Sequence, residues 1–230
     1  MSQPSNPVLD AAAAAALPRA PGIHDVETRL ADGRLARFTL ALPAAADTAP
    51  PLIVVLHYAG EPTRFYGRPL LQQLFAPALA PLGAVLVAPE SLGGQWSEPR
   101  NEGMVIALTD ALLATYDIDT ARVALGGYSM GAVGCWHLGA HYPERFSALI
   151  PLAGLPAGPV EATQPAYLLA TPSDELFPFA RFEDLAASRR AAGQVVELAA
   201  VEAQGHYDVG AFAAPLAAVA DWLDAQWETA

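Results

Sequence analysis

A serine flanked by glycines is the first feature of this sequence that could carry chemistry. Residues Gly127–Gly131 read Gly-Tyr-Ser-Met-Gly, following the apolar run Val123-Ala124-Leu125 and preceding a helical stretch at Ala132–His141. A serine on a sharp bend between a buried strand and a helix stands out from the sheet, and the helix N-terminus favours negative charge on its oxygen. This context predicts that Ser129 is a nucleophile. The bare pattern would also suit a glycine-rich turn that packs a helix onto a strand.

A serine nucleophile needs a base, and the base needs a group that orients it. Ligands of open α/β sheets bind beyond the carboxyl ends of the strands, so partners are expected just after strands. Asp174 follows the apolar run Ala166–Ala170, and His206 follows Val195–Ala200. The sequence therefore predicts a catalytic triad of Ser129, Asp174 and His206. Glu175 remains the alternative to Asp174.

The other histidines fit the role of the base less well. His24 and His57 precede the serine, whereas His137 and His141 lie on the helical stretch behind it. The last two are four residues apart, the spacing of a helical metal-binding pair, but no glutamate follows His137 and no third ligand is evident. Neither a metal site nor a cofactor is predicted.

Acyl transfer also needs hydrogen-bond donors for the oxygen of the tetrahedral intermediate. One donor is expected to be the N–H of Met130, the residue after the nucleophile. The second is expected from the loop that follows Leu52–Leu56. The N–H of Ala59 is the preferred candidate, and that of Tyr58 is the alternative.

Aromatic residues occur in several loops that are expected near the same edge of the sheet. The candidate substrate-binding residues are Tyr58, Trp96, Phe177 and Tyr207. Ordinary packing is the alternative for each of them. Only a short link containing proline and glycine joins Ala148–Leu152 to Ala166–Ala170, which leaves no room for a helical lid. An open site of this kind favours small to medium esters.

The elements that must position these residues alternate along the chain. Short apolar runs predict buried strands at Leu52–Leu56, Ala84–Ala88, Arg122–Gly126, Ala148–Leu152, Ala166–Ala170 and Val195–Ala200. Helices are predicted between and after them, at Arg68–Ala80, Val105–Tyr116, Ala132–His141, Phe179–Ala192 and Val209–Trp227. This alternation predicts an α/β fold with a mostly parallel sheet and helices on both faces.

Two N-terminal features complete the predicted organisation. Val26–Leu30 and Leu35–Leu42 alternate in character around Asp32-Gly33, which predicts an antiparallel hairpin. Residues 1–22 are rich in alanine and proline and are expected to form a flexible tail, with at most a helical turn through the alanines. Residues 23–230 are expected to form one domain.

Composition excludes several classes of protein. The net charge of −12 argues against binding to nucleic acid. The sequence has no lysine, which excludes a Ser–Lys dyad, a Schiff-base enzyme and a Walker-type phosphate loop. Its one cysteine, Cys135, cannot form an internal disulfide. No signal sequence or membrane span is evident, so a soluble, cytoplasmic protein is expected; its oligomeric state is not predicted.

Taken together, these segments resemble a known group of enzymes. The stretch Tyr116–Gly154, with the aspartate loop Thr171–Pro178 and the pair Gly205-His206, is similar to lid-poor esterases of the α/β-hydrolase superfamily. Within that superfamily the sequence resembles the phospholipase/carboxylesterase, feruloyl esterase and polyhydroxybutyrate-depolymerase-like families. The resemblance covers roughly residues 35–227. It implies an α/β-hydrolase fold and a serine esterase that acts on a small-molecule ester through an acyl-enzyme on Ser129.

The sequence departs from this group at two positions. These families usually carry His-Gly after the third strand, whereas Tyr58 follows His57 here, and Ala132 stands where a second glycine is common. A thioesterase, a lactonase or an amidase would use the same triad. A hydrolase fold that binds without catalysis is a further alternative, although such proteins usually lack a triad residue.

Overall fold

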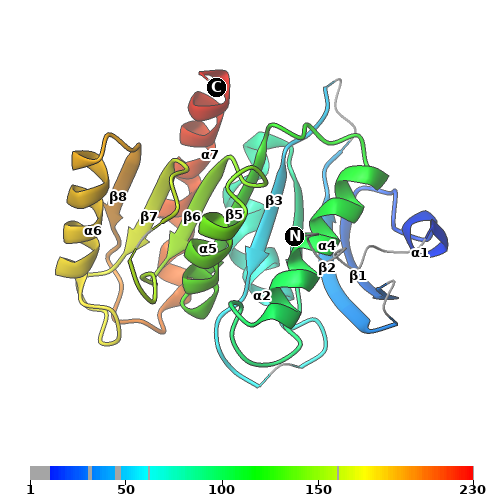
Figure 1. The fold of residues 1–230 in the computed structure, drawn as a ribbon, viewed down its shortest axis with the longest axis horizontal. Helices are drawn as coiled ribbons and strands as arrows, with labels where there is room; N and C mark the ends of the chain where they lie inside the picture. The colour runs from blue at the N-terminus through cyan, green and yellow to red at the C-terminus, as the bar shows by residue number, and fades with distance from the viewer. Residues whose placement is uncertain (1–10, 31–32, 45–47, 62, 160, 230) are drawn as a thin grey trace, which may run out of the picture.

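A computed structural model describes residues 11–30, 33–44, 48–61, 63–159 and 161–229. Eight strands form one sheet in the order β1-β2-β4-β3-β5-β6-β7-β8 (Figure 1). Their bounds are β1 Gly22–Arg29, β2 Leu35–Leu42, β3 Leu52–Leu56, β4 Val85–Pro89, β5 Val123–Tyr128, β6 Ala148–Leu152, β7 Ala166–Ala170 and β8 Val196–Ala200. β2 pairs antiparallel with β1 and β4, and the remaining pairs are parallel. The predicted hairpin and parallel sheet are confirmed.

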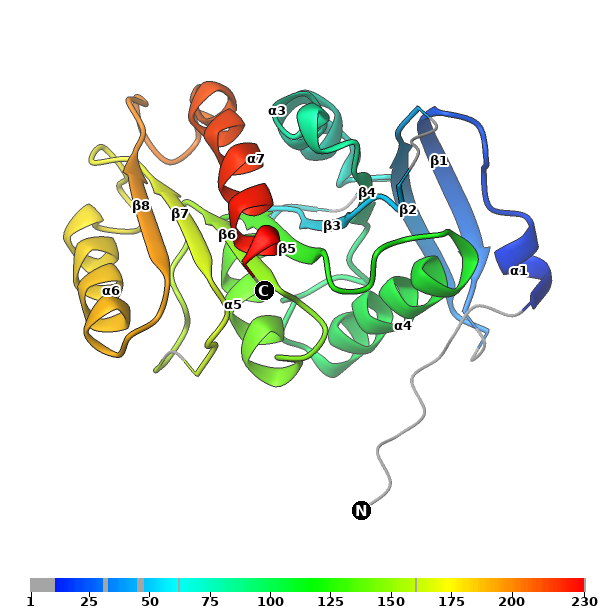
Figure 2. The same cartoon turned by 90° about the horizontal axis from the view of Figure 1, so that it is seen from above.

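Helices cover both faces of the sheet, as Figure 2 shows. One face carries α4 Pro99–Thr115, α5 Met130–His141 and α6 Phe179–Ala191. The other face carries α7 Ala213–Glu228, preceded by η3 Val209–Phe212, and the segment α2 Arg68–Leu70, η1 Leu71–Phe75, α3 Ala76–Ala78 and η2 Ala80–Leu82. A separate hydrophobic core fills each of the two interfaces. The continuous apolar runs follow from this layering, because β3, β4, β5 and β6 are buried at every position.

Two predicted elements differ in the structure. β8 was expected to be buried on both faces, but it is the edge strand and is largely accessible after Val196. The predicted helix Arg68–Ala80 is divided into four short turns. Pro69 and Pro77 lie within it and Pro81 directly follows it. A proline supplies no N–H for a helical hydrogen bond.

Residues 11–22, part of the segment expected as a tail, contact the rest of the chain in the structure. Ala11–Ala15 form the short helix α1, and Leu17 is only 3% exposed in the core. Arg19 donates to the carbonyl of Thr115, and the Tyr116 hydroxyl donates to the carbonyl of Pro18. This segment is therefore part of the domain. Residues 1–10 and Asp32 lie outside the described residues.

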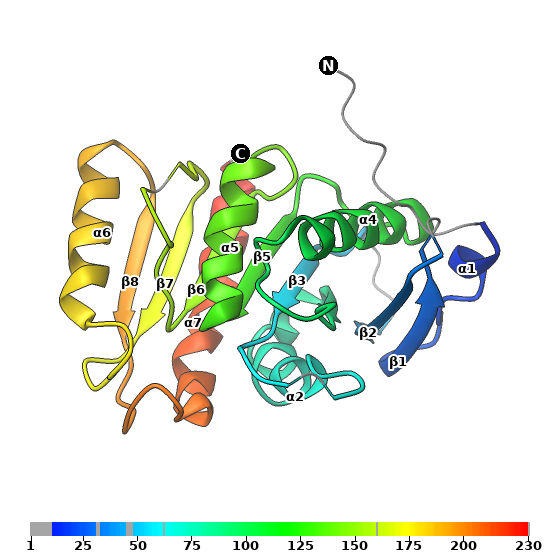
Figure 3. The ribbon, with the colours of Figure 1, turned by 60° about the horizontal axis from the view of Figure 1, so that its bottom comes forward.

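The parallel strands bring several loops to one edge of the sheet. Figure 3 turns the carboxyl ends of these strands toward the viewer, where the chain leaves β3 for α2 and β8 for η3. In the described part of the link between β6 and β7, residues 153–159 and 161–165, there is no helix. None of the described helices combines the length and apolar character that crossing a membrane requires.

Candidate active site

Ser129 lies in a strained turn between β5 and α5. Its backbone has φ 54° and ψ −115°, a combination that residues with a side chain rarely adopt. Such a conformation costs on the order of 1–3 kcal/mol and persists only where its surroundings impose it. Here the N–H of Ser129 donates to the carbonyl of Leu152 on the neighbouring strand β6. The turn places the side chain at the carboxyl edge of the sheet.

The glycines around Ser129 are explained by close backbone contacts. A Cβ atom on Gly131 would lie 2.0 Å from the carbonyl oxygen of Leu56, and one on Gly127 would lie 2.5 Å from the backbone of Gly131. Gly154, just beyond β6, has the same role, since its Cβ would lie 2.6 Å from the carbonyl oxygen of Ser129. The bend that presents the serine therefore depends on three glycines that surround it.

Three side chains from distant parts of the sequence meet at this edge. The Oγ of Ser129 lies 2.8 Å from Nε2 of His206, and Nδ1 of His206 lies 2.8 Å from Oδ2 of Asp174. A carboxylate only accepts hydrogen bonds, so Nδ1 carries the proton and Nε2 of the neutral ring accepts from the serine hydroxyl. The arrangement can remove a proton from Ser129.

Asp174 is held in a fixed orientation beneath the imidazole. Its side chain is fully buried, and its Oδ1 accepts the N–H groups of Leu176 and Phe177, each at 2.8 Å. These two bonds leave Oδ2 for His206. Of the two candidate acids, Asp174 is the one that contacts the ring. Glu175 instead accepts the backbone N–H of His206 at 2.9 Å.

The loop after β3 is held by the side chain of His57, for which the sequence predicted no role. His57 is 1% exposed, and its Nε2 accepts the backbone N–H of Ser91. The ring proton is therefore on Nδ1, which donates to the carbonyl of Tyr58 at 2.7 Å. Burial lowers the pKa of His57 to about 4. A neutral imidazole therefore fixes this peptide group. Its position directly after a buried strand was the one feature of the sequence that could have indicated this role for His57.

Two further aromatic residues support the same loop. The indole N–H of Trp96 donates to the carbonyl of His57 at 2.9 Å, and the hydroxyl of Tyr66 donates to the carbonyl of Ala59 at 3.4 Å. Trp96 is 1% exposed, so its predicted role as a substrate-binding wall is wrong. It packs inside the core, where it contacts Gly134 of α5.

Of the other three aromatic candidates, two lie beside His206 and the third lines a separate cavity. The rings of Phe177 and Tyr207 are 5.5 Å and 5.3 Å from that of His206, and Tyr207 is 76% exposed. Tyr58 lines a cavity of about 120 Å³ together with Leu70, Val209 and other residues of α2, η1 and η3. These positions are compatible with substrate contact, which stays a prediction.

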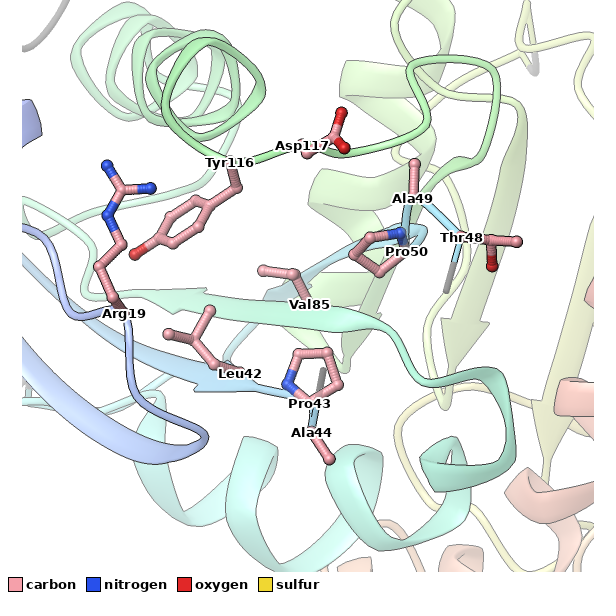
Figure 4. Close-up of a pocket in the computed structure, with 10 residues that line it drawn as sticks. All are labelled: Arg19, Leu42, Pro43, Ala44, Thr48, Ala49, Pro50, Val85, Tyr116 and Asp117. Atoms are coloured by element: carbon pink, nitrogen blue, oxygen red, sulfur yellow. The ribbon is translucent and has the colours of Figure 1, made fainter. Parts of the chain in front are cut away.

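A larger cavity of about 280 Å³ lies at the opposite edge of the sheet (Figure 4). The side chain of Arg19 lies near the ring of Tyr116 at one end of it, and Thr48, Ala49 and Pro50 lie at the other. Because it surrounds the amino ends of β3 and β4, it is remote from Ser129 and cannot serve a reaction there.

The two helical histidines make other contacts. Nε2 of His137 lies 2.7 Å from Oε2 of Glu102, and the rings of His137 and His141 stack at 4.1 Å. Among the residues that the structure describes, no three His, Cys, Asp or Glu side chains are placed to hold a metal ion.

The fold is shared with esterases and serine hydrolases of known structure. A thermostable esterase superimposes with a TM-score of 0.71 at 21% identity, over 88% of this chain and 62% of that one. A ferulic acid esterase gives 0.70 at 15% identity, over 90% and 100% of the two chains. The fluorophosphonate-binding serine hydrolase F of Staphylococcus aureus gives 0.68 at 9% identity, over 89% and 99%. The chain therefore has the α/β-hydrolase fold.

Similarity at the level of sequence is more limited. Acetylxylan esterase A of Emericella nidulans is 29% identical over 135 residues, which are 53% of this chain and 43% of that protein. The chain thus spans less than half of this relative and less than two thirds of the thermostable esterase. No protein-family model matches the sequence.

Proposed function

We propose that the chain is a serine esterase that hydrolyses small to medium carboxylic esters through an acyl-enzyme. The observation that carries this proposal is the continuous hydrogen-bonded chain from Ser129 through His206 to Asp174, with both links at 2.8 Å. The likeness to esterases in fold supports it. Neither a cofactor nor a metal ion has a part in the proposed reaction.

In the proposed mechanism His206 acts first as a base and then as an acid. It takes the proton of Ser129 while Oγ bonds to the ester carbonyl carbon, and it returns the proton to the departing alcohol. A water molecule then attacks the acyl-enzyme, gives its proton to His206, and the acid is released as Ser129 is protonated again. Asp174 stabilises the imidazolium that forms in each half-reaction.

The N–H groups of Met130 and Ala59 are proposed to bind the oxyanion. Met130 is the first residue of α5, where the backbone N–H groups are free of helical partners and the helix dipole favours negative charge. Support for Ala59 is indirect. A trans peptide holds its N–H opposite its C=O, so the bond from His57 to the carbonyl of Tyr58 also fixes the direction of the N–H of Ala59.

The cavity beside Tyr58 is proposed to take the acyl chain. At about 120 Å³ it is smaller than the roughly 300–1,000 Å³ of sites for drug-sized ligands. Leu70 and Leu74 line it and are each 2% exposed, so the cavity ends against the core. A short acyl group is therefore preferred over a fatty acyl chain.

A fluorophosphonate probe and a series of p-nitrophenyl esters test this function. The probe should label Ser129, and Ser129→Ala should abolish both labelling and turnover. The value of kcat/KM should be highest for the shortest acyl chains, and Leu70→Ala should move the optimum to longer ones. Absence of labelling in the folded wild-type protein would refute the proposal. Matched ester, thioester and amide substrates separate an esterase from a thioesterase or an amidase.

The cytoplasm is the proposed location of the protein. The single cysteine, Cys135, is buried, and a chain without disulfides suits a reducing compartment. Fractionation of the cells that produce the protein tests this proposal, and recovery of the esterase activity outside the cytoplasm would contradict it.

A further inference from the structure

The backbone of His206, and not only its ring, is held by side chains. Its carbonyl accepts a hydrogen bond from the hydroxyl of Tyr128 at 2.7 Å, and its N–H donates to Oε2 of Glu175 at 2.9 Å. Both the N–H and the C=O of His206 are therefore hydrogen-bonded to side chains from other segments of the chain. The sequence predicted neither contact.

The two residues that hold the backbone are chain neighbours of the two that contact the ring. Tyr128 ends β5 immediately before Ser129, and Glu175 immediately follows Asp174. The segment that supplies the nucleophile thus also fixes the carbonyl of His206. Likewise, the segment that supplies the acid also fixes its N–H. A shift of the histidine relative to either partner would break a backbone bond as well as a ring bond.

Such support matters because His206 lies on a loop between β8 and η3. Within this loop the hydrogen bond from the N–H of Asp208 to the carbonyl of Gly205 is long, at 3.2 Å, and the side chain of Asp208 accepts the N–H of Gln204 at 3.1 Å. Proton transfer requires donor and acceptor within hydrogen-bond reach, and a displacement of about 1 Å can cost on the order of 10²-fold in rate. A loop residue therefore needs external anchors to work as a base.

The chemistry of both anchors suits them to this task. Tyr128 is 1% exposed, and its burial, together with the nearby charge of Asp174, raises the pKa of its hydroxyl well above the usual value. It therefore remains a donor at neutral pH. The bond from the N–H of His206 lowers the pKa of Glu175, so this carboxylate stays charged and accepts. The contact from Tyr128 is buried, whereas Glu175 is exposed at the rim.

We propose that Tyr128 and Glu175 are positioning residues, a two-point clamp on the backbone that keeps the imidazole of His206 aligned between Ser129 and Asp174. The clamp acts through His206 and touches neither the substrate nor the reacting atoms. This inference rests on the proposed esterase function.

Three variants test the clamp. Tyr128→Phe removes only the hydroxyl donor, Glu175→Ala removes the acceptor, and Glu175→Gln restores an oxygen acceptor without the charge. Tyr142→Phe is the matched control, because the hydroxyl of Tyr142, at the end of α5, also donates a 2.7 Å hydrogen bond, to Glu102 of α4. The measurements are kcat and KM for p-nitrophenyl acetate, and the rate and final stoichiometry of fluorophosphonate labelling.

We expect Tyr128→Phe and Glu175→Ala to lower kcat about 10–100-fold with KM changed by less than about threefold, because substrate binding is unaffected. Labelling should be slower by a similar factor but reach the same final stoichiometry, which separates misalignment from misfolding. Glu175→Gln should recover most of the rate lost in Glu175→Ala, and Tyr142→Phe should match the wild type.

The outcomes separate the clamp from the function on which it rests. If the wild type reacts with the probe and Tyr128→Phe and Glu175→Ala react equally fast, the clamp is refuted. The proposed esterase function is then unaffected. A reduced final stoichiometry in proportion to the loss of rate would also overturn it, since the residues would then only stabilise the fold. A wild-type protein that never reacts would overturn both.

Discussion

The substitution Asp174→Asn tests the orientation of the proposed base most directly. The N–H groups of Leu176 and Phe177 both donate to one side-chain oxygen of Asp174. An asparagine must turn its only oxygen toward them, because its NH₂ group cannot accept. The amide nitrogen then faces Nδ1 of His206, where the carboxylate oxygen lies 2.8 Å away in the wild type.

Two donors cannot share this contact, so the imidazole must move its proton from Nδ1 to Nε2. Nε2 then donates toward Ser129 instead of accepting, and the base is lost while the shape is preserved. In serine proteases with this triad, the same amidation costs about 10⁴-fold in kcat. We expect a loss of similar size here, which corresponds to about 5 kcal/mol of transition-state stabilisation at about 1.4 kcal/mol per tenfold.

The assay is the steady-state turnover of p-nitrophenyl acetate, with circular dichroism to verify that the variant is folded. Glu175→Gln is the matched control, because it makes the same chemical change at the adjacent position, where an amide oxygen still accepts the N–H of His206. It should remain at least a hundredfold more active than Asp174→Asn. If Asp174→Asn kept near-full activity while Glu175→Gln lost it, the assignment of the acid would be refuted.

Further predictions concern strain, packing and pH. Ser129→Gly should be more stable than Ser129→Ala by about 1–2 kcal/mol in urea denaturation, because only glycine adopts φ 54° without strain; equal stabilities would contradict this. Gly131→Ala should destabilise the protein by more than about 2 kcal/mol, because the added Cβ would lie 2.0 Å from the carbonyl oxygen of Leu56. Gly103→Ala is the control: it lies in α4 with open space around the added Cβ and should stabilise the protein by about 0.5–1 kcal/mol. The pKa of His57 is lowered from 6.5 to about 4, so the unfolded chain binds the extra proton between these values. Neutral His57 should therefore contribute about 3 kcal/mol to the free energy of unfolding above pH 6.5, and this contribution should be lost as the pH falls to about 4. In His57→Asn the free energy of unfolding should fall less steeply between these two pH values.

The sequence by itself determined the layered architecture. Strands buried between two helical layers must be apolar on both faces, so β3, β6 and β7 could be read directly from their apolar runs. The order of strands and helices then determined which loops reach the carboxyl edge. The proposed triad of Ser129, Asp174 and His206 was predicted from the glycine-flanked serine and from the position of each residue just after a strand.

The tertiary structure decided the features that depend on contacts between distant segments. The adjacent carboxylates of Asp174 and Glu175 differ little in sequence, and only the fold directs one to the ring and the other to the backbone of His206. Trp96 shows the same limit, since an aromatic residue in a loop can face either a substrate or the core, and here it is buried. The hydrophobic periodicity of the sequence indicates which faces of a helix or strand are buried. Hydrogen bonds between loops depend instead on how the packed helices and strands place those loops next to one another.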